Sequence, residues 1–154
     1  MARRAEEAVR IAVLNGPNLN LLGTREPALY GHDSLADVER KLGDVARALN
    51  FDIEFAQRNG EGALVDVIQE WRSRVHGAVV NAGAYSHTSL AIRDALSAVA
   101  IPFVEVHITN VYAREPERQR SMLAPAAIGV VYGLGVFGYE LALRGLAAHL
   151  ASRG

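Results

Sequence analysis

Residues 11–31 read IAVLNGPNLNLLGTREPALYG, an apolar run followed by a long connection. The run, Ile11–Leu14, is typical of a buried strand. The connection, residues 15–31, exceeds the roughly two to six residues usual between a strand and a helix, and long ordered connections tend to be lids or binding loops. A solvated surface loop is the alternative interpretation of the same stretch.

The connection contains three side chains that can take part in binding or catalysis: Asn18, Arg25 and Tyr30. A cation close to a tyrosine favours the phenolate, which makes the phenol a usable base. The alternative is a tyrosine that packs against its own scaffold. This segment alone supports both interpretations.

Apolar runs recur along the chain at intervals of about twenty-five residues and alternate with helical patterns. After Ile11–Leu14 the predicted strands are Phe51–Ala56, Ala78–Asn81, Pro102–Val106 and Ile128–Tyr132. Apolar residues at spacings of three and four predict helices over residues 35–49, 64–75, 88–99 and 139–150. Asp33 or Ser34 can cap the first helix, and Pro102 follows the third.

This alternation predicts parallel strands joined by right-handed crossovers. We expect an α/β fold: a flavodoxin-like doubly wound five-stranded parallel sheet with helices on both faces. We expect one domain over residues 1–154, with residues 1–9 as a flexible N-terminal extension.

In such a sheet, ligands bind beyond the carboxyl ends of the strands. Polar residues follow three of the predicted strands: Asn15 and Asn18, then Asn81, Tyr85, Ser86 and His87, then His107, Thr109 and Asn110. We therefore expect a functional site at this rim, and the convergence carries more weight than any single motif.

Glu105 and His107 are two residues apart in a predicted strand, so their side chains point to the same side. The carboxylate can orient the imidazole or hold it protonated, as a general acid requires. A structural histidine bonded to backbone is the alternative for His107, and its place beside Glu105 at the rim argues against it.

His87 lies in the segment NAGAYSHTS, residues 81–89, whose small residues allow a ligand to approach the backbone. Asn81 and His87 offer hydrogen-bond donors for hydroxyls or a carboxylate. The same segment can simply begin a helix, capped by Ser86 or Thr88, and both interpretations can hold together.

Three arginines, Arg114, Arg118 and Arg120, follow the fourth predicted strand. Two of them at a spacing of four would share a helix face, and guanidinium groups bind carboxylates in bidentate fashion. A solvated charged face balanced by Glu115 and Glu117 is an equally good interpretation.

Composition excludes several classes of function. The chain has no cysteine, which removes disulfides, thiolate metal sites and cysteine nucleophiles. The net charge is −1 without a basic block, which argues against nucleic acid or an anionic membrane as partner. The only lysine, Lys41, lies within a predicted helix, which disfavours Schiff-base chemistry. The histidines are scattered along the sequence, so we expect no metal site. The start of the chain does not resemble a secretory signal, so we expect a cytoplasmic protein.

The segment GLGVFG, residues 133–138, matches the GxGxxG dinucleotide pattern and lies between a strand and a helix. No later strand can supply the acidic residue that holds a ribose, so we favour a glycine-rich turn. A non-catalytic flavodoxin-like module that binds a nucleotide or phosphate is the alternative function. A tyrosine base, a histidine acid, arginines and amides instead suit proton abstraction beside a carbonyl and loss of a hydroxyl.

From residue 11 to residue 150 the chain resembles the type II 3-dehydroquinate dehydratases. The matching motifs are Asn15-Gly-Pro-Asn-Leu, Arg25-Glu-Pro, Tyr30-Gly, Asn81-Ala-Gly-Ala-Tyr, His87-Thr-Ser, Glu105-Val-His-Ile, Asn110, Ala113-Arg-Glu, Gly133-Leu-Gly and Gly138-Tyr. Several ordered motifs at compatible spacing are far more specific than any one of them.

The resemblance implies a lyase that dehydrates 3-dehydroquinate to 3-dehydroshikimate without a cofactor, in the shikimate pathway or in quinate catabolism. It implies Tyr30 as base, Arg25 and Arg114 as stabilisers of the phenolate, and His107 supported by Glu105 as acid. It implies that Asn18 holds a water that stabilises the enolate. The implied substrate-binding residues are Asn81, His87, Ile108, Thr109 and Arg118, with Asp94 reaching a site in a neighbouring subunit. It also implies a homo-dodecamer, a tetramer of trimers.

The sequence departs from the family pattern at four places. Thr109 stands where serine is usual, Tyr112 where histidine is common, Glu117 where phenylalanine is common, and Arg58 where a small residue is usual. We expect these departures to alter substrate affinity or assembly contacts and to leave the chemistry intact.

Overall fold

Five parallel strands form one sheet in the order β2-β1-β3-β4-β5 in this computed structural model, which describes residues 8–153. The strands are β1 (Arg10–Asn15), β2 (Asp52–Gln57), β3 (Gly77–Asn81), β4 (Phe103–His107) and β5 (Gly129–Tyr132). The helices are α1 (Pro27–Tyr30), α2 (Leu35–Ala48), α3 (Glu61–Glu70), α4 (Leu90–Val99) and α5 (Phe137–Ser152). Five short 3-10 helices lie in the connections: η1 (Leu19–Leu21), η2 (Gly83–His87), η3 (Val111–Ala113), η4 (Pro116–Arg118) and η5 (Ala124–Ala126).

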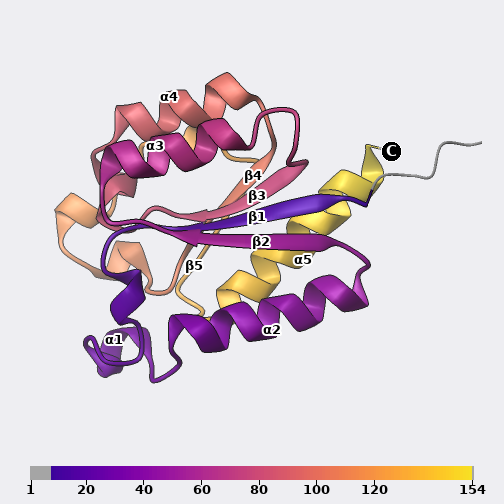
Figure 1. The fold of residues 1–154 in the computed structure, drawn as a ribbon. Helices are drawn as coiled ribbons and strands as arrows, with labels where there is room; N and C mark the ends of the chain where they lie inside the picture. Colours follow the sequence, from indigo (N-terminus) through magenta and orange to yellow (C-terminus); the bar gives the residue numbers. More distant parts are fainter. Residues whose placement is uncertain (1–7, 154) are drawn as a thin grey trace, which may run out of the picture.

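Helices cover both faces of the sheet, α3 and α4 on one and α2 and α5 on the other (Figure 1). The alternation of side chains along β1 builds the two cores. Ile11 and Val13 pack with residues of α2 and α5, whereas Ala12 and Leu14 pack with residues of α3 and α4. The strand order reverses between β1 and β3, so the predicted flavodoxin-like doubly wound fold is confirmed.

The first long helix begins where the sequence predicts, and Ser34 is its cap. The Ser34 hydroxyl accepts a hydrogen bond from the Asp37 backbone, and the Asp37 carboxylate accepts one from the Ser34 backbone. This capping box satisfies two backbone donors at the helix start. Asp33, the other candidate, instead accepts a hydrogen bond of 3.1 Å from Lys41.

The predicted bounds of the second helix are wrong at both ends. The helix predicted over residues 64–75 runs from Glu61 to Glu70, and Ser73 follows with a left-handed φ of 63° that ends the regular coil. Trp71 and Val75 remain buried beyond the helix.

The next helix, α4, is capped by Ser89, and not by Ser86 or Thr88. The Ser89 hydroxyl accepts a hydrogen bond from the Ile92 backbone. The preceding residues form the 3-10 helix η2, which begins at Gly83 with a φ of 60°. A glycine tolerates this backbone conformation without a steric penalty.

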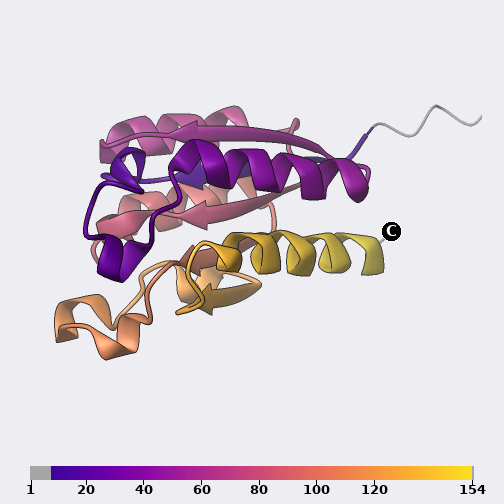
Figure 2. The same cartoon turned by 90° about the horizontal axis from the view of Figure 1, so that it is seen from below.

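The connection after β1 contains local structure of its own, η1 and α1. Gly23 and Gly31 flank the α1 region with positive φ values of 93° and 82°. Figure 2 shows that α1 lies at the same end of the molecule as the segment that follows β4. The fold therefore carries the two polar segments of the sequence to one end of the sheet.

The predicted extension, residues 1–9, lies outside the described residues except for Ala8 and Val9. Val9 packs against the core, and its carbonyl accepts a hydrogen bond from the Asp52 backbone. Between residues 8 and 153, no helix has the length and apolar character needed to cross a membrane.

Candidate active site

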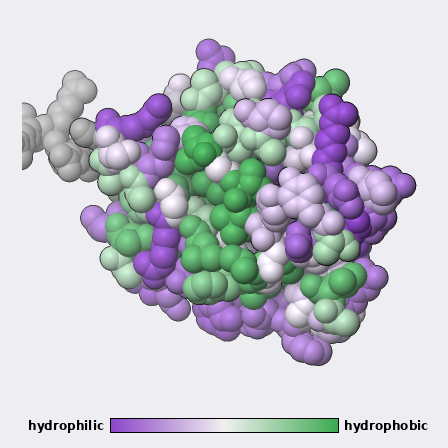
Figure 3. Space-filling model, turned by 180° about the vertical axis from the view of Figure 1, so that it is seen from behind, coloured by the Kyte–Doolittle hydropathy of each residue, from purple (hydrophilic) through white to green (hydrophobic). Residues whose placement is uncertain are grey.

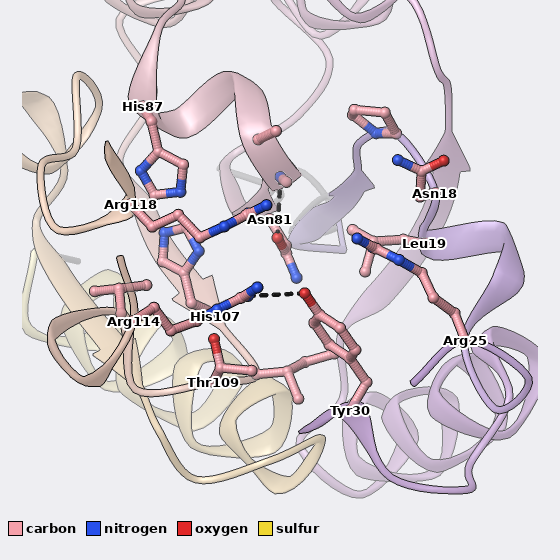
Figure 4. Close-up of a pocket in the computed structure, with 15 residues that line it drawn as sticks. Asn18, Leu19, Arg25, Tyr30, Asn81, His87, His107, Thr109, Arg114 and Arg118 are labelled. Atoms are coloured by element: carbon pink, nitrogen blue, oxygen red, sulfur yellow. Dashed lines mark hydrogen bonds between the residues drawn. The ribbon is translucent and has the colours of Figure 1, made fainter. Parts of the chain in front are cut away.

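A pocket opens at the carboxyl ends of β1, β3 and β4 (Figure 4). Its lining comprises Pro17, Asn18, Leu19, Arg25, Tyr30, Asn81, Gly83, Ala84, His87, His107, Ile108, Thr109, Val111, Arg114 and Arg118. Of the polar residues expected at this rim, Asn18, Asn81, His87, His107 and Thr109 line the pocket. The pocket also collects arginines and a tyrosine from segments far apart in the sequence.

Tyr30 ends the short helix α1 and extends over the pocket toward the segment after β4 (Figure 4). Arg114 donates a hydrogen bond of 2.8 Å from Nη1 to the Tyr30 hydroxyl. The guanidinium carbons of Arg25 and Arg114 lie 4.9 and 5.7 Å from the centre of the Tyr30 ring. Two cations thus flank one phenol, an arrangement that favours a negative charge on its oxygen.

Arg114 and Arg118 both line the pocket, but they do not share a helix face. The segment after β4 folds into the separate 3-10 helices η3 and η4, and Gln119 donates a hydrogen bond of 2.8 Å to the Arg114 carbonyl between them. The spacing of four therefore does not place them on one helix face, and the turns bring both guanidinium groups to the rim instead. Glu115 accepts a hydrogen bond of 2.5 Å from Arg118 and partly balances its charge.

Glu105 and His107 point to the same side of β4, as predicted. The imidazole Nε2 donates a hydrogen bond of 3.1 Å to Oε1 of Glu105, whose side chain is fully buried. The Ser121 hydroxyl also contacts both carboxylate oxygens. This bond fixes the ring of His107 and leaves Nδ1 available to the pocket.

Ser121 was not identified from the sequence as a site residue. Its oxygen accepts hydrogen bonds from the backbone of Leu123 and Ala124, each 3.0 Å, while its hydroxyl donates to Glu105. The hydrogen bond between Ser121 and Glu105 joins positions 16 residues apart, so no local sequence motif predicts it.

His87 lies against His107, with ring centres 5.9 Å apart and an angle of 22° between the rings. Its Nδ1 is 2.8 Å from the Arg120 carbonyl, which can only accept, so Nδ1 carries the proton. Burial lowers the pKa of His87, and the neighbouring His107 and Arg118 lower it further, against the carbonyl of Arg120. A neutral His87 therefore presents an unprotonated Nε2 as an acceptor.

Asn81 is the last residue of β3, and Asn18 follows β1 and caps the start of η1. The Asn81 amide oxygen accepts a hydrogen bond of 3.1 Å from the Gly83 backbone, drawn in Figure 4. Asn18 has a left-handed φ of 70°, and its backbone donates to the Asn59 side chain at 3.1 Å.

Four residues expected at the rim lie outside the pocket lining. They are Asn15, Tyr85, Ser86 and Asn110. Asn15 and Ser86 are fully buried, and Asn110 caps η3 through its side chain. Asp94 is exposed on α4 and does not line this pocket, and its expected contribution to a neighbouring subunit stays a prediction. Glu105 contacts the pocket only through His107.

The glycine pattern at residues 133–138 forms the turn between β5 and α5. Gly133 and Gly135 have φ values of 92° and 64°, and a side chain on Gly133 would lie 3.1 Å from the Asn110 side chain. The turn follows the edge strand β5, away from the reversal between β1 and β3 where doubly wound sheets bind nucleotides. In the part of the chain that the structure describes, no three His, Asp or Glu side chains are grouped as metal ligands would be.

The pocket combines a phenol between two guanidinium groups with an imidazole held by a buried carboxylate. These groups can remove a proton at one point of a small ligand and deliver a proton at another. The fold and the pocket together define a flavodoxin-like α/β enzyme with an acid–base site.

Comparison with known proteins identifies the family. The model of the family "Dehydroquinase class II" matches residues 9–147. A 3-dehydroquinate dehydratase of Gemmatimonas aurantiaca is 63% identical over 136 residues, which cover 88% of this chain and 90% of the relative. A catabolic 3-dehydroquinase of Aspergillus oryzae is 53% identical over 143 residues, 93% of this chain and 94% of the relative.

The fold agrees with this assignment. The crystal structure of a type II dehydroquinase from Propionibacterium acnes superimposes with a TM-score of 0.86 at 40% identity, over 92% of this chain and 99% of that one. The chain belongs to the class II dehydroquinase family.

Proposed function

We propose that this chain dehydrates 3-dehydroquinate to 3-dehydroshikimate, with Tyr30 as the base and His107 as the acid. The family assignment and the names of its relatives support the reaction. One structural observation carries the mechanism: Tyr30 and His107 line the same pocket, each with its own charged partner.

In the first step the Tyr30 phenolate removes a proton from the carbon beside the ketone. A cation beside a phenol favours the charged form of its oxygen. Arg114, whose side chain is only 15% exposed, donates a hydrogen bond to this oxygen, and the guanidinium of Arg25 lies over the ring.

The electrons of the broken C–H bond move to the ketone oxygen and form an enolate. Asn18, at the end of β1, would hold a water that donates a hydrogen bond to this oxygen. Such a donor aimed at the developing charge lowers the barrier because it favours the enolate over the ketone.

In the second step the C–O bond to the hydroxyl two carbons from the ketone breaks. His107 donates a proton from Nδ1, and the hydroxyl leaves as water. The Glu105 carboxylate keeps Nε2 occupied, so that the ring delivers its proton in one direction. After the reaction Tyr30 holds a proton and His107 lacks one, and water resets both groups between turnovers.

The remaining polar residues of the lining would bind the substrate. Asn81 would donate to a hydroxyl, and the neutral His87 would accept from one through Nε2. The backbone of Ile108 and Thr109, together with Arg118, would bind the carboxylate. Asp94 would contribute from a neighbouring subunit.

The segment between Gly23 and Gly31 would act as a lid that carries Arg25 and Tyr30. Both glycines have positive φ values, which gives the segment two points where the backbone can change direction at little cost. Closure would bring Tyr30 against Arg114, the contact that this structure contains.

We also propose that the chain assembles as a homo-dodecamer, a tetramer of trimers, in the cytoplasm. Figure 3 shows hydrophobic residues gathered on the face opposite to that of Figure 1. A groove along the edge strand β5 supports self-association, because exposed apolar surface of this kind often marks an interface. Its apolar lining includes Val104, residues 128–131 and Leu141. Light scattering coupled to gel filtration tests the subunit number. The relatives include enzymes named 3-dehydroquinate dehydratase and one named catabolic 3-dehydroquinase, and the proposal covers either pathway role.

Incubation of the purified protein with 3-dehydroquinate tests the proposed reaction. The product is a conjugated enone, so ultraviolet absorbance rises as it forms. We expect turnover after dialysis against a metal chelator and without an added cofactor. Folded protein that produces no enone would refute the proposed function.

A further inference from the structure

A buried tyrosine that the reaction does not use lies directly behind the pocket. Tyr139, in the first turn of α5, is fully buried. It directly follows the glycine-rich turn that the dinucleotide interpretation would have explained. Its hydroxyl reaches the carboxyl ends of β1 and β3, where Asn15 and Asn81 are paired in register.

The Tyr139 hydroxyl makes two hydrogen bonds of opposite sense. It donates to Oδ1 of Asn15 at 2.5 Å and accepts from Nδ2 of Asn81 at 2.8 Å. Burial raises the pKa of Tyr139 above its ordinary value, which favours the protonated hydroxyl. Because Nδ2 of Asn81 can only donate, the hydroxyl accepts from it and uses its own proton for Asn15.

These bonds determine how Asn81 presents its amide. The oxygen of Asn81 accepts from the Gly83 backbone at 3.1 Å, and the nitrogen donates to Tyr139. The reversed amide would set its nitrogen against the Gly83 N–H, donor against donor. An amide nitrogen carries two hydrogens, and Tyr139 uses one of them. The second stays available to the pocket that Asn81 lines.

We propose that Tyr139 is a positioning residue that locks the Asn81 amide with an N–H donor toward the substrate. This inference rests on the proposed function, because it assigns a cause to the binding role of Asn81. Asn15 accepts the hydrogen bond from the Tyr139 hydroxyl and so completes a chain of three side chains, Asn15, Tyr139 and Asn81. This chain joins β1, α5 and β3, and it gives the helix after the glycine-rich turn a role in the site.

Tyr139→Phe tests the inference because it removes one oxygen and leaves the ring in the core. An uncoupled neutral hydrogen bond corresponds to about a tenfold change in affinity. We expect KM to rise about tenfold and kcat to stay within about twofold, as loss of a uniform binding contact requires. Leu143→Ala is the matched control, because Leu143 is fully buried in the same helix and contacts neither amide through a polar atom. It should lower the melting temperature and leave KM unchanged.

A double-mutant cycle separates positioning from loss of structure. In an Asn81→Ala background, Tyr139→Phe should change KM by less than about twofold, because the residue through which it acts is gone. Equal effects in both backgrounds would overturn the inference. If Tyr139→Phe does not fold, Asn15→Ala serves in its place: we expect about a threefold rise in KM that also vanishes without Asn81.

The wild-type assay keeps the two proposals apart. Wild-type protein without turnover refutes the proposed function itself. Active wild-type protein with additive variants refutes only the positioning role of Tyr139.

Discussion

The guanidinium of Arg114 donates a hydrogen bond of 2.8 Å to the hydroxyl of Tyr30, a residue 84 positions earlier in the chain. The bond joins the short helix α1 to the turns after β4 across the mouth of the pocket (Figure 4). It places a positive charge beside the atom that the proposed mechanism requires to become negative. Its counterpart on the acid side of the pocket is the bond between Glu105 and His107.

Removal of the Tyr30 hydroxyl should abolish most turnover. Tyr30→Phe takes away the base and keeps the ring between its two arginines, so we expect kcat to fall by about 10²–10⁴-fold with KM little changed. Enone absorbance measures the rate. Tyr112→Phe is the control, because that side chain is 60% exposed and outside the pocket lining, and its activity should be normal. Near-normal turnover by Tyr30→Phe would remove Tyr30 from the role of base.

Loss of the Arg114 charge should slow the reaction. Arg114→Gln removes the charged donor to the Tyr30 oxygen, so kcat should fall by about 10–100-fold. Steady-state kinetics with the enone assay measure this. Arg47→Gln, at an exposed ion pair with Asp44, is the matched control and should retain the wild-type kcat. An unchanged kcat for Arg114→Gln would contradict the assigned role.

Loss of the Glu105 charge should slow the reaction more than loss of the Ser121 hydroxyl that holds this carboxylate. Glu105→Gln keeps the shape and removes the charge, and we expect kcat to fall by about 100-fold or more with KM within a few-fold. Ser121→Ala leaves the carboxylate in place without the hydroxyl that holds it, so its effect should be smaller, about tenfold. Steady-state kinetics of both variants test this order. A larger loss of kcat for Ser121→Ala than for Glu105→Gln would show that Ser121 does not act through the carboxylate.

The half-buried His87 should make folding weaker in acid. Its pKa is lowered in the folded chain, mainly by burial, so as the pH falls below the ordinary value of 6.5 the unfolded chain binds the proton first. The stability contributed by neutral His87 is complete above that value and declines toward the folded pKa.

His87→Gln removes this titration, so the variant should lose less stability than the wild type between about pH 7.5 and 5.5. Urea denaturation midpoints at the two pH values measure the difference, and the other histidines cancel in the comparison. Equal acid sensitivity of the two proteins would contradict the assignment.

Much of the fold follows from periodic patterns in the sequence. Strand β1 and helix α2 were predicted to within one residue at each end, because buried strands and amphipathic helices repeat over several residues. The shared orientation of Glu105 and His107 was also correct, since it depends only on strand geometry.

The errors concern short elements and distant contacts. The spacing of Arg114 and Arg118 suggested a shared helix face, and the segment instead folds into two 3-10 turns whose local preference is weak. Tertiary contacts determine such turns: the backbone of Met122 donates to the Ser86 carbonyl at 2.7 Å and fixes where the segment returns to the sheet. The roles of Ser121 and Tyr139 were missed for a related reason. Their partners are distant in sequence, and a periodic pattern carries no information about them.

Deuterium incorporation into 3-dehydroquinate tests the central claim most directly, because it separates the base from the acid. His107→Asn should still form the enolate through Tyr30 while loss of the hydroxyl is blocked. In D₂O we therefore predict that this variant exchanges one hydrogen beside the ketone faster than buffer does, as recovered substrate would show by mass spectrometry, and that Tyr30→Phe exchanges none above the buffer rate. Exchange by Tyr30→Phe at the rate of His107→Asn, or no catalysed exchange by His107→Asn, would contradict the account.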